Sequence, residues 1–162
     1  MNDSVFLDNG TFRRVWQRVA GSAAAPDAAQ QDTDVLAGRL ADCIRAKAAG
    51  AAFYMALAQR IRTGRQQLAQ IAAQERAHRK ALQVEYFLRT GEVCTTPAAC
   101  PRLGTVAQDL RSAYAQELVL AEQLDAAAAA AQPPLCSRLS AMAQQDRRHA
   151  QTVRDLLACV LH

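Results

Sequence analysis

The stretch Gln-Glu-Arg-Ala-His at residues 74–78 places a carboxylate and an imidazole three positions apart. On a helix, Glu75 and His78 therefore lie on the same side, about 60° apart around the axis. Burying such groups costs several kcal/mol unless partners compensate them. The stretch thus predicts a buried polar site in a helical core, because apolar side chains follow the same side of the helix at helical spacing: Leu68, Ile71 and Leu82.

The same pattern returns 71 residues later, with Asp146 and His149 in the equivalent places on a second apolar stripe. Ahead of these stripes, Lys47 and Glu117 are equivalent at an offset of 70 residues. A duplicated helical hairpin sets its two polar faces opposite each other across one core. We therefore expect six side chains to converge at one level of the protein: Lys47, Glu75, His78, Glu117, Asp146 and His149.

The composition favours helix almost everywhere, because alanine, leucine, glutamine and arginine are plentiful while only seven glycines and five prolines occur. A length of 162 residues corresponds to about one domain with a sizeable core. Helices are expected over about 32–62, 65–89, 105–131 and the remainder to about 160. Glycine or proline ends the periodic pattern between them.

The connection over residues 91–104 decides how these helices are arranged. Its fourteen residues span at most ~45–50 Å when extended, which is about the length of one helix. The sequence therefore predicts an all-α, ferritin-like four-helix bundle, in which two helical hairpins are joined by a crossover loop. The alternative is an up-down-up-down bundle, which needs a short second loop.

Residues 1–31 are expected to form a segment of their own ahead of a bundle domain at 32–162. Apolar side chains at helical spacing predict a short amphipathic helix over 11–20, and the Ala, Pro and Gln residues of 22–31 indicate a linker. We expect the short helix to pack on the bundle or on the second subunit of a homodimer, rather than on a membrane.

Charge and cysteine content exclude several classes of function. The net charge of +4 is dispersed and lacks interleaved aromatic residues, which argues against nucleic-acid binding. No apolar run reaches the ~20 residues that cross a bilayer. Five cysteines without a Cys-x-x-Cys pair or a signal peptide favour the reducing cytoplasm. Cys94 and Cys100 flank a proline-containing loop, where two separate thiols are favoured over a disulfide.

Carboxylates and imidazoles that converge inside a bundle are the ligand set of first-row transition metals, iron and manganese in particular. A metal ion also resolves the burial problem, because it compensates several buried anions at once. With a Glu on one helix and a Glu-x-x-His on another, the pattern follows a known template for metal sites in bundles.

At these motifs the chain resembles the ferritin-like superfamily, and within it the rubrerythrin-type di-iron carboxylate proteins. The resemblance covers roughly residues 35–160. It implies a bundle that binds two irons and reacts with dioxygen or peroxide, often as a dimer. It rests on four segments: Phe53-Tyr54, Gln-Glu-Arg-Ala-His at 74–78, Tyr-Ala-Gln-Glu at 114–117 and Gln-Asp-Arg-Arg-His at 145–149.

The resemblance also implies a role for each matching residue. Glu75 and Asp146 would bridge the two metals, and His78 would complete the first metal. Glu117 and His149 would be the terminal ligands of the second metal. Tyr54 lies two turns along the first helix from position 47, and its phenol is expected near the site.

Two positions depart from the family pattern. Lys47 stands where the family has a glutamate, and a protonated lysine cannot ligate a metal. Asp146 replaces a glutamate and is shorter by one methylene. We therefore expect a modified site with one iron or manganese ion per chain, in which the Lys47 ammonium stands near the position of the other cation. The alternative is a metal-free salt-bridge network of Lys47 with Glu75, Glu117 and Asp146.

These features predict a metal-binding oxidoreductase, a peroxidase or oxidase that acts on peroxide or dioxygen with electrons from an external donor. The alternatives are a metal-free structural or interaction protein, and a protein of iron handling or storage. Two further residues are weaker candidates for the site. Cys43 is expected to be a core residue rather than a ligand, and Glu85 a solvated residue near a helix end.

Overall fold

The computed structural model describes residues 27–97 and 100–161, with side chains from residue 33 onward. The helical body that begins at Asp32 is described by itself. Within the described ranges the protein is all-α, as the sequence predicts, and contains no strand. Four helices make up almost all of it: α2 (Asp27–Arg60), α3 (Arg65–Thr90), α4 (Val106–Ala129) and α5 (Leu135–Leu161).

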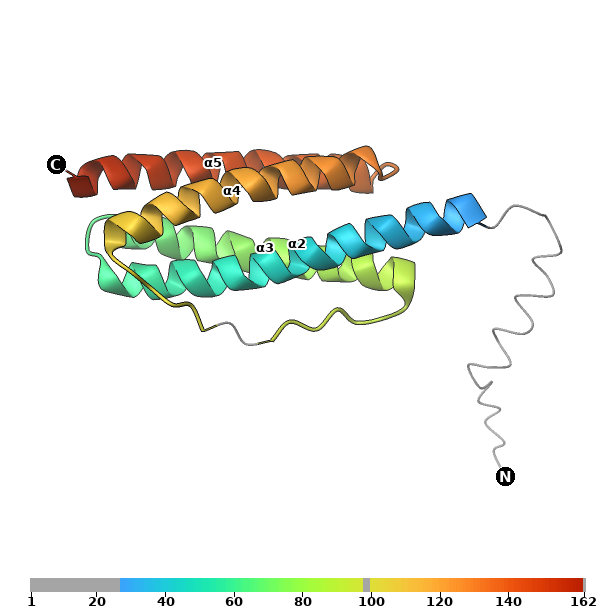
Figure 1. The fold of residues 1–162 in the computed structure, drawn as a ribbon, viewed down its shortest axis with the longest axis horizontal. Coiled ribbons are helices and arrows are strands. Elements are labelled where there is room, and N and C mark those ends of the chain that lie inside the picture. Colours follow the sequence, from blue (N-terminus) through green and yellow to red (C-terminus); the bar gives the residue numbers. More distant parts are fainter. Residues whose placement is uncertain (1–26, 98–99, 162) are drawn as a thin grey trace, which may run out of the picture. The chain divides into compact units, whose positions relative to one another are not determined.

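The four helices form two antiparallel hairpins, α2 with α3 and α4 with α5 (Figure 1). The connection from α3 to α4 runs back along the length of the bundle, so that these two helices point in the same direction. This arrangement confirms the bundle of two hairpins joined by a crossover loop. The up-down-up-down alternative is wrong for this chain.

Helix α2 begins earlier than predicted, at Asp27 rather than near Asp32. The residues between them are Ala28, Ala29, Gln30 and Gln31, which are good helix formers. Helix propensity therefore extends α2 into the predicted linker. The prediction of a short helix over 11–20 falls outside the described residues.

Local chemistry fixes both ends of α3 and the start of α4. Gly64 precedes α3 with φ 84° and Gly91 follows it with φ 72°, conformations that side chains disfavour. At Gly64, an added Cβ would also lie 2.3 Å from Leu156 Cδ2 of α5. Thr105 and Gln108 form a reciprocal capping box at the start of α4. The turns are therefore specified by the sequence itself.

Two apolar clusters fill the bundle and leave a polar level between them. On α2, Leu40 and Ile44 belong to one cluster, while Tyr54 and Leu57 belong to the other. The other three helices change cluster at the same level, so Lys47 lies between two apolar regions. The core face of α2 is buried throughout: Leu36, Leu40, Cys43, Lys47, Tyr54 and Leu57.

The five cysteines are free thiols. Cys94 is buried in one apolar cluster and Cys100 is exposed, so the preference for two separate thiols over a disulfide is confirmed. In the part of the chain that the structure describes, no helix combines the length and the apolar character that spanning a membrane requires.

Candidate metal centre in the bundle core

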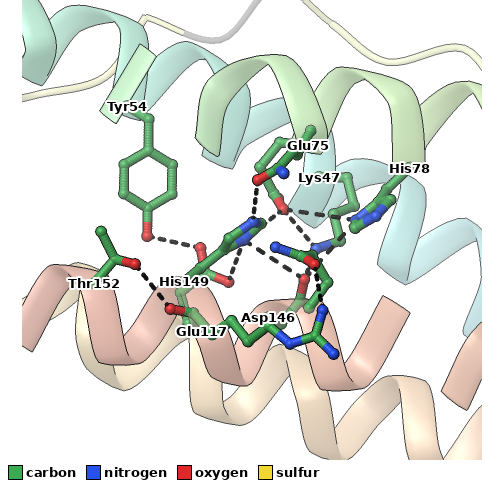
Figure 2. A network of polar contacts seen from close by, with 11 residues as sticks. Lys47, Tyr54, Glu75, His78, Glu117, Asp146, His149 and Thr152 are labelled. Carbon is green, nitrogen blue, oxygen red and sulfur yellow. Dashed lines mark hydrogen bonds and ion pairs between the residues drawn. The ribbon is translucent and has the colours of Figure 1, made fainter. Parts of the chain in front are cut away.

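All four helices contribute charged side chains to the polar level between the two clusters (Figure 2). Lys47 comes from α2, Glu75 from α3 and Glu117 from α4, whereas α5 supplies both Asp146 and His149. Each of these five residues is 3% exposed or less. The structure therefore buries five ionisable groups together at one level, as the repeat in the sequence predicts.

Four of these side chains converge on one point. One ligand atom from each of Glu75, Glu117, Asp146 and His149 can be chosen so that all four lie within 4.8 Å of one another. His149 Nδ1 is 3.5 Å from Glu117 Oε2 and 3.6 Å from Glu75 Oε1. It is 3.8 Å from Asp146 Oδ1. Three carboxylates thus surround one imidazole nitrogen.

The Lys47 ammonium lies between the two carboxylates that the family resemblance assigns as metal bridges. Its Nζ donates to Glu75 Oε1 at 2.7 Å and to Asp146 Oδ1. Burial acts to lower the pKa of Lys47, but Glu75 and Asp146 outweigh burial and raise it. Lys47 is therefore a fixed cation in the core, held there by its hydrogen bonds to these two carboxylates.

Tyr54 lies on the other side of the site, where its hydroxyl donates to Glu117 Oε1 at 2.6 Å (Figure 2). Burial and the adjacent Glu117 carboxylate raise the pKa of Tyr54 well above its ordinary value. The side chain therefore stays a phenol. The sequence prediction that Tyr54 lies near the site is confirmed.

His149 is oriented by a side chain from the opposite hairpin. Its Nε2 lies 2.8 Å from Gln74 Oε1, and because that amide oxygen can only accept, Nε2 carries the hydrogen. Nδ1 is then the atom that faces the carboxylates. Burial acts to lower the pKa of His149, but the nearby Glu117 and Glu75 raise it to about 9. In metal-free protein, a proton on Nδ1 balances part of the negative charge.

His78 stands apart from this group of four. Its side chain is 18% exposed, and its Nδ1 is 4.0 Å from Glu75 Oε1 and 3.9 Å from Asp146 Oδ1. Burial and the Lys47 ammonium lower the pKa of His78 to about 4, so the ring is neutral. The structure thus places His78 beside the lysine, at the edge of the cluster rather than among the converging ligand atoms.

Three ligand atoms of the cluster are buried without a hydrogen-bond partner: Glu117 Oε2, Asp146 Oδ2 and His149 Nδ1. Unpartnered buried polar atoms cost free energy and call for an explanation. Burial also raises the pKa of Asp146 to about 7, against the opposing effect of Lys47. An ion bound among these atoms would satisfy all three.

Two contributors are not evident as site residues in the sequence. Gln74 is part of the quoted motif, yet only the fold shows that its amide reaches His149 across the bundle. Gly50 lets the Glu75 carboxylate approach α2, since an added Cβ would lie 3.0 Å from Glu75 Oε2. A glycine inside a helix is unfavourable, and this was the signal that could have identified it.

The two weaker candidates have structural roles. The prediction of a solvated Glu85 is wrong, because it is buried and pairs with Arg89 and with Arg138 of α5, away from the cluster. Cys43 belongs to an apolar cluster, and burial raises the pKa of its thiol to about 11. It is a core residue, as expected.

The chain matches no family model, no curated protein and no solved structure.

Proposed function

We propose that this chain binds one iron or manganese ion in the bundle core, with Glu75, Glu117, Asp146 and His149 as ligands. The observation that carries the proposal is the set of buried, unpartnered ligand atoms on three of these residues, which come from the adjacent helices α4 and α5 and lie beside the Glu75 carboxylate of α3. Three carboxylates and one imidazole are a donor set that suits iron(II) and manganese(II).

Charge balance supports a single ion. Three carboxylates carry three negative charges, the Lys47 ammonium carries one positive charge, and a divalent ion adds two, so that the buried site is neutral with His149 uncharged. A second divalent ion does not fit, because Lys47 Nζ already occupies the space between Glu75 and Asp146. In this respect the site is a modified version of the di-iron centre that the family resemblance implies.

The surroundings supply what a metal site requires beyond its ligands. The hydrogen bond from Gln74 fixes the ring of His149 with Nδ1 toward the site, an interaction that metal-ligating histidines commonly make. Tyr54 donates to Glu117 in the same way. Both contacts orient ligands, and the two apolar clusters keep bulk water away from them.

We further propose an oxidoreductase of the ferritin-like, rubrerythrin-related type that acts on peroxide or dioxygen. A bound iron or manganese ion supplies the one-electron chemistry that such oxidants need. The chain itself contributes two buried proton donors beside the ligands, the Tyr54 phenol and the Lys47 ammonium. Electrons come from an external donor, and a cytoplasmic homodimer remains the expected setting.

The second candidate is a metal-free bundle that serves as a structural or interaction protein. Its support is the network in which Lys47 bonds Glu75 and Asp146 while Tyr54 bonds Glu117. Such networks can persist without adding stability. A metal-free bundle does not, however, account for the unpartnered oxygens of Glu117 and Asp146.

The test is an anaerobic titration of metal-free protein with iron(II) and with manganese(II), followed by calorimetry and elemental analysis. We expect one tightly bound ion per chain in the parent protein and much weaker binding of the ion to the Glu117→Gln variant. The exposed Glu122 on the same helix is the control, and Glu122→Gln should bind like the parent protein. Two tightly bound ions per chain, or none, would contradict the proposal.

Adding peroxide to the iron-loaded protein separates catalysis from binding alone. We expect an absorbance change that the Glu117→Gln variant lacks and the Glu122→Gln variant retains. A solution mass far above that of a dimer, with iron retained in large excess over one ion per chain, would instead favour iron storage.

A further inference from the structure

A pocket of about 400 Å³ lies between α2 and α4, directly over one side of the polar cluster. Its volume falls in the range of sites that hold small organic molecules. Its walls come from the facing sides of two helices, and its floor contains Tyr54, Glu75 and Glu117. The walls consist mainly of small or apolar residues: Ala46, Ala49, Gly50, Phe53, Ala115 and Val119.

The floor of this pocket offers a hydrogen-bond acceptor that the fold does not use. Oε1 of Glu75 accepts from Lys47, which leaves Oε2 of the same carboxylate for a ligand. This Oε2 lies directly under Gly50, where the absence of a side chain leaves it open to the pocket. Apolar walls over a carboxylate oxygen fit a ligand with an apolar body and one hydrogen-bond donor.

The charges of the site indicate that this ligand is neutral. A carboxylate or phosphate would face Glu75 and Glu117 at close range and be repelled. An ammonium on Glu75 would approach the Lys47 ammonium, which already donates to the other oxygen of the same carboxylate at 2.7 Å. A hydroxyl group donates a hydrogen bond without adding charge.

We propose that the pocket between α2 and α4 binds a small neutral organic molecule with an apolar body and a single hydroxyl or hydroperoxyl group. The O–H group points to the floor and donates to Oε2 of Glu75, while the body packs on Phe53 and the alanines. If the metal site acts on peroxide, its substrate is then an organic hydroperoxide. That last step alone rests on the proposed function.

A second copy of this chain is a poorer occupant than a small molecule. A helix from another subunit would close the pocket with side chains over Glu75, and it would bury Oε2 of this carboxylate without an obligatory donor. Leaving such an oxygen unpaired costs free energy. A small molecule with an O–H group supplies the missing donor.

The probe is 2-phenylpropan-2-ol, an unreactive alcohol, titrated into metal-free protein and followed by amide chemical shifts. We expect saturable shifts centred on Gly50 and Gln116, both of which line the pocket. The methyl ether of the same alcohol, which keeps the body and lacks the O–H donor, should bind about tenfold more weakly or worse. Equal binding of alcohol and ether would overturn the proposed head group.

Blocking the pocket provides the decisive comparison. Ala115→Leu adds bulk at the pocket wall from an exposed position of α4, and should abolish the shifts. Ala126→Leu makes the same change at an exposed position of α4 outside the pocket, and should leave binding unchanged. If circular dichroism shows that Ala115→Leu is unfolded, Val119→Phe serves as the second blocking variant.

Two results would overturn the pocket itself. One is alcohol binding to Ala115→Leu or Val119→Phe with the affinity of the parent protein. The other is a concentration-dependent dimer whose formation shifts the same amides and excludes the alcohol. Because these titrations use metal-free protein, the pocket can fail while the metal site is retained, and the reverse also holds.

Discussion

The two hairpins bring equivalent residues to the same level of the bundle, but their environments differ. His149 of the second hairpin is buried, and Gln74 orients its ring through Nε2, whereas His78 is 18% exposed and lacks a corresponding glutamine contact. Gln145, the counterpart of Gln74, bonds Arg148 instead of His78. The repeat therefore supplies two similar half-sites, of which only the second has the supporting contacts of a metal ligand.

Position 47 completes the difference between the hairpins. Where the second hairpin has Glu117, the first has Lys47, a cation whose charge lowers the pKa of His78. This one difference supplies a positive charge to the first half-site and disfavours a metal ion there. The two halves of a repeat can therefore keep equivalent positions at one level of a bundle and still differ in charge.

The largest expected effect is the pH dependence of metal affinity, which tests which hairpin provides the histidine ligand. A metal ion must displace protons from Asp146, with a pKa of about 7, and from His149, with a pKa of about 9. Affinity should therefore rise about a hundredfold per pH unit below pH 7 and about tenfold per unit between pH 7 and 9. Above pH 9 it should level off.

Calorimetric titrations at several pH values measure these slopes and the released protons together. If His78 were the histidine ligand in place of His149, its pKa of about 4 would leave no imidazole proton to displace above pH 6. A metal affinity that stays constant between pH 7 and 9 would therefore identify His78 of the first hairpin as the histidine ligand.

The same groups give metal-free protein the opposite pH trend in stability. The pKa of Asp146 is raised on folding, so its contribution is lost as pH rises from about 4 through 7. The pKa of His149 is also raised, so its contribution is present below pH 6.5 and is lost as pH rises through 9. Thermal unfolding of metal-free protein should therefore shift to lower temperature between pH 6 and 10.

Removing the cation of the first hairpin should have the next largest effect. Lys47→Met leaves Glu75 and Asp146 buried without their shared partner, which should lower the free energy of unfolding of metal-free protein by about 3–5 kcal/mol. The exposed Lys80 provides a matched control, since Lys80→Met removes the same charge from a solvated position. Urea unfolding measures both, and equal losses would contradict a structural role for Lys47.

Replacing each of the two histidines in turn by alanine compares the two half-sites directly. His149→Ala should weaken metal binding roughly a hundredfold or more, because it removes a ligand, whereas His78→Ala should change the affinity only slightly. Competition with a chelator of known affinity measures both variants. Equal losses of affinity in the two variants would mean that both histidines ligate the ion.

The smallest effect is expected from the supporting glutamines. Gln74→Ala frees the ring of His149 and should weaken metal binding about 10–100-fold, as for other residues that orient a ligand. Gln145→Ala should have no measurable effect on affinity, because its amide bonds Arg148. A comparable loss in both variants would remove the proposed asymmetry of the two half-sites.

Most of the fold could be predicted from the sequence, because helical periodicity and glycine or proline breaks act locally. The start of α2 was missed, since helix propensity at Ala28–Gln31 outweighed a composition that suggested a linker. The convergence of the polar residues followed from the repeat, which turns a sequence offset into spatial symmetry. A pattern of that kind needs no knowledge of individual side-chain contacts.

Contacts that break the symmetry could not be predicted in the same way. Gln74 and Gln145 are equivalent in the repeat, and only the packing of the two hairpins shows that one bonds a histidine and the other an arginine. The burial of Glu85 likewise depends on Arg138, 53 residues away in the chain. These partners are set by three-dimensional packing rather than by spacing along one helix.

Gly50 has a consequence for engineering this protein. Replacing a glycine inside a helix with alanine is a common way to raise stability, by up to about 1 kcal/mol. Here the new methyl group would lie 3.0 Å from Glu75 Oε2 and force that carboxylate to shift. A thermostability screen that selects alanine at this position would therefore gain helix propensity and displace a carboxylate of the polar cluster, a change that a stability measurement does not report.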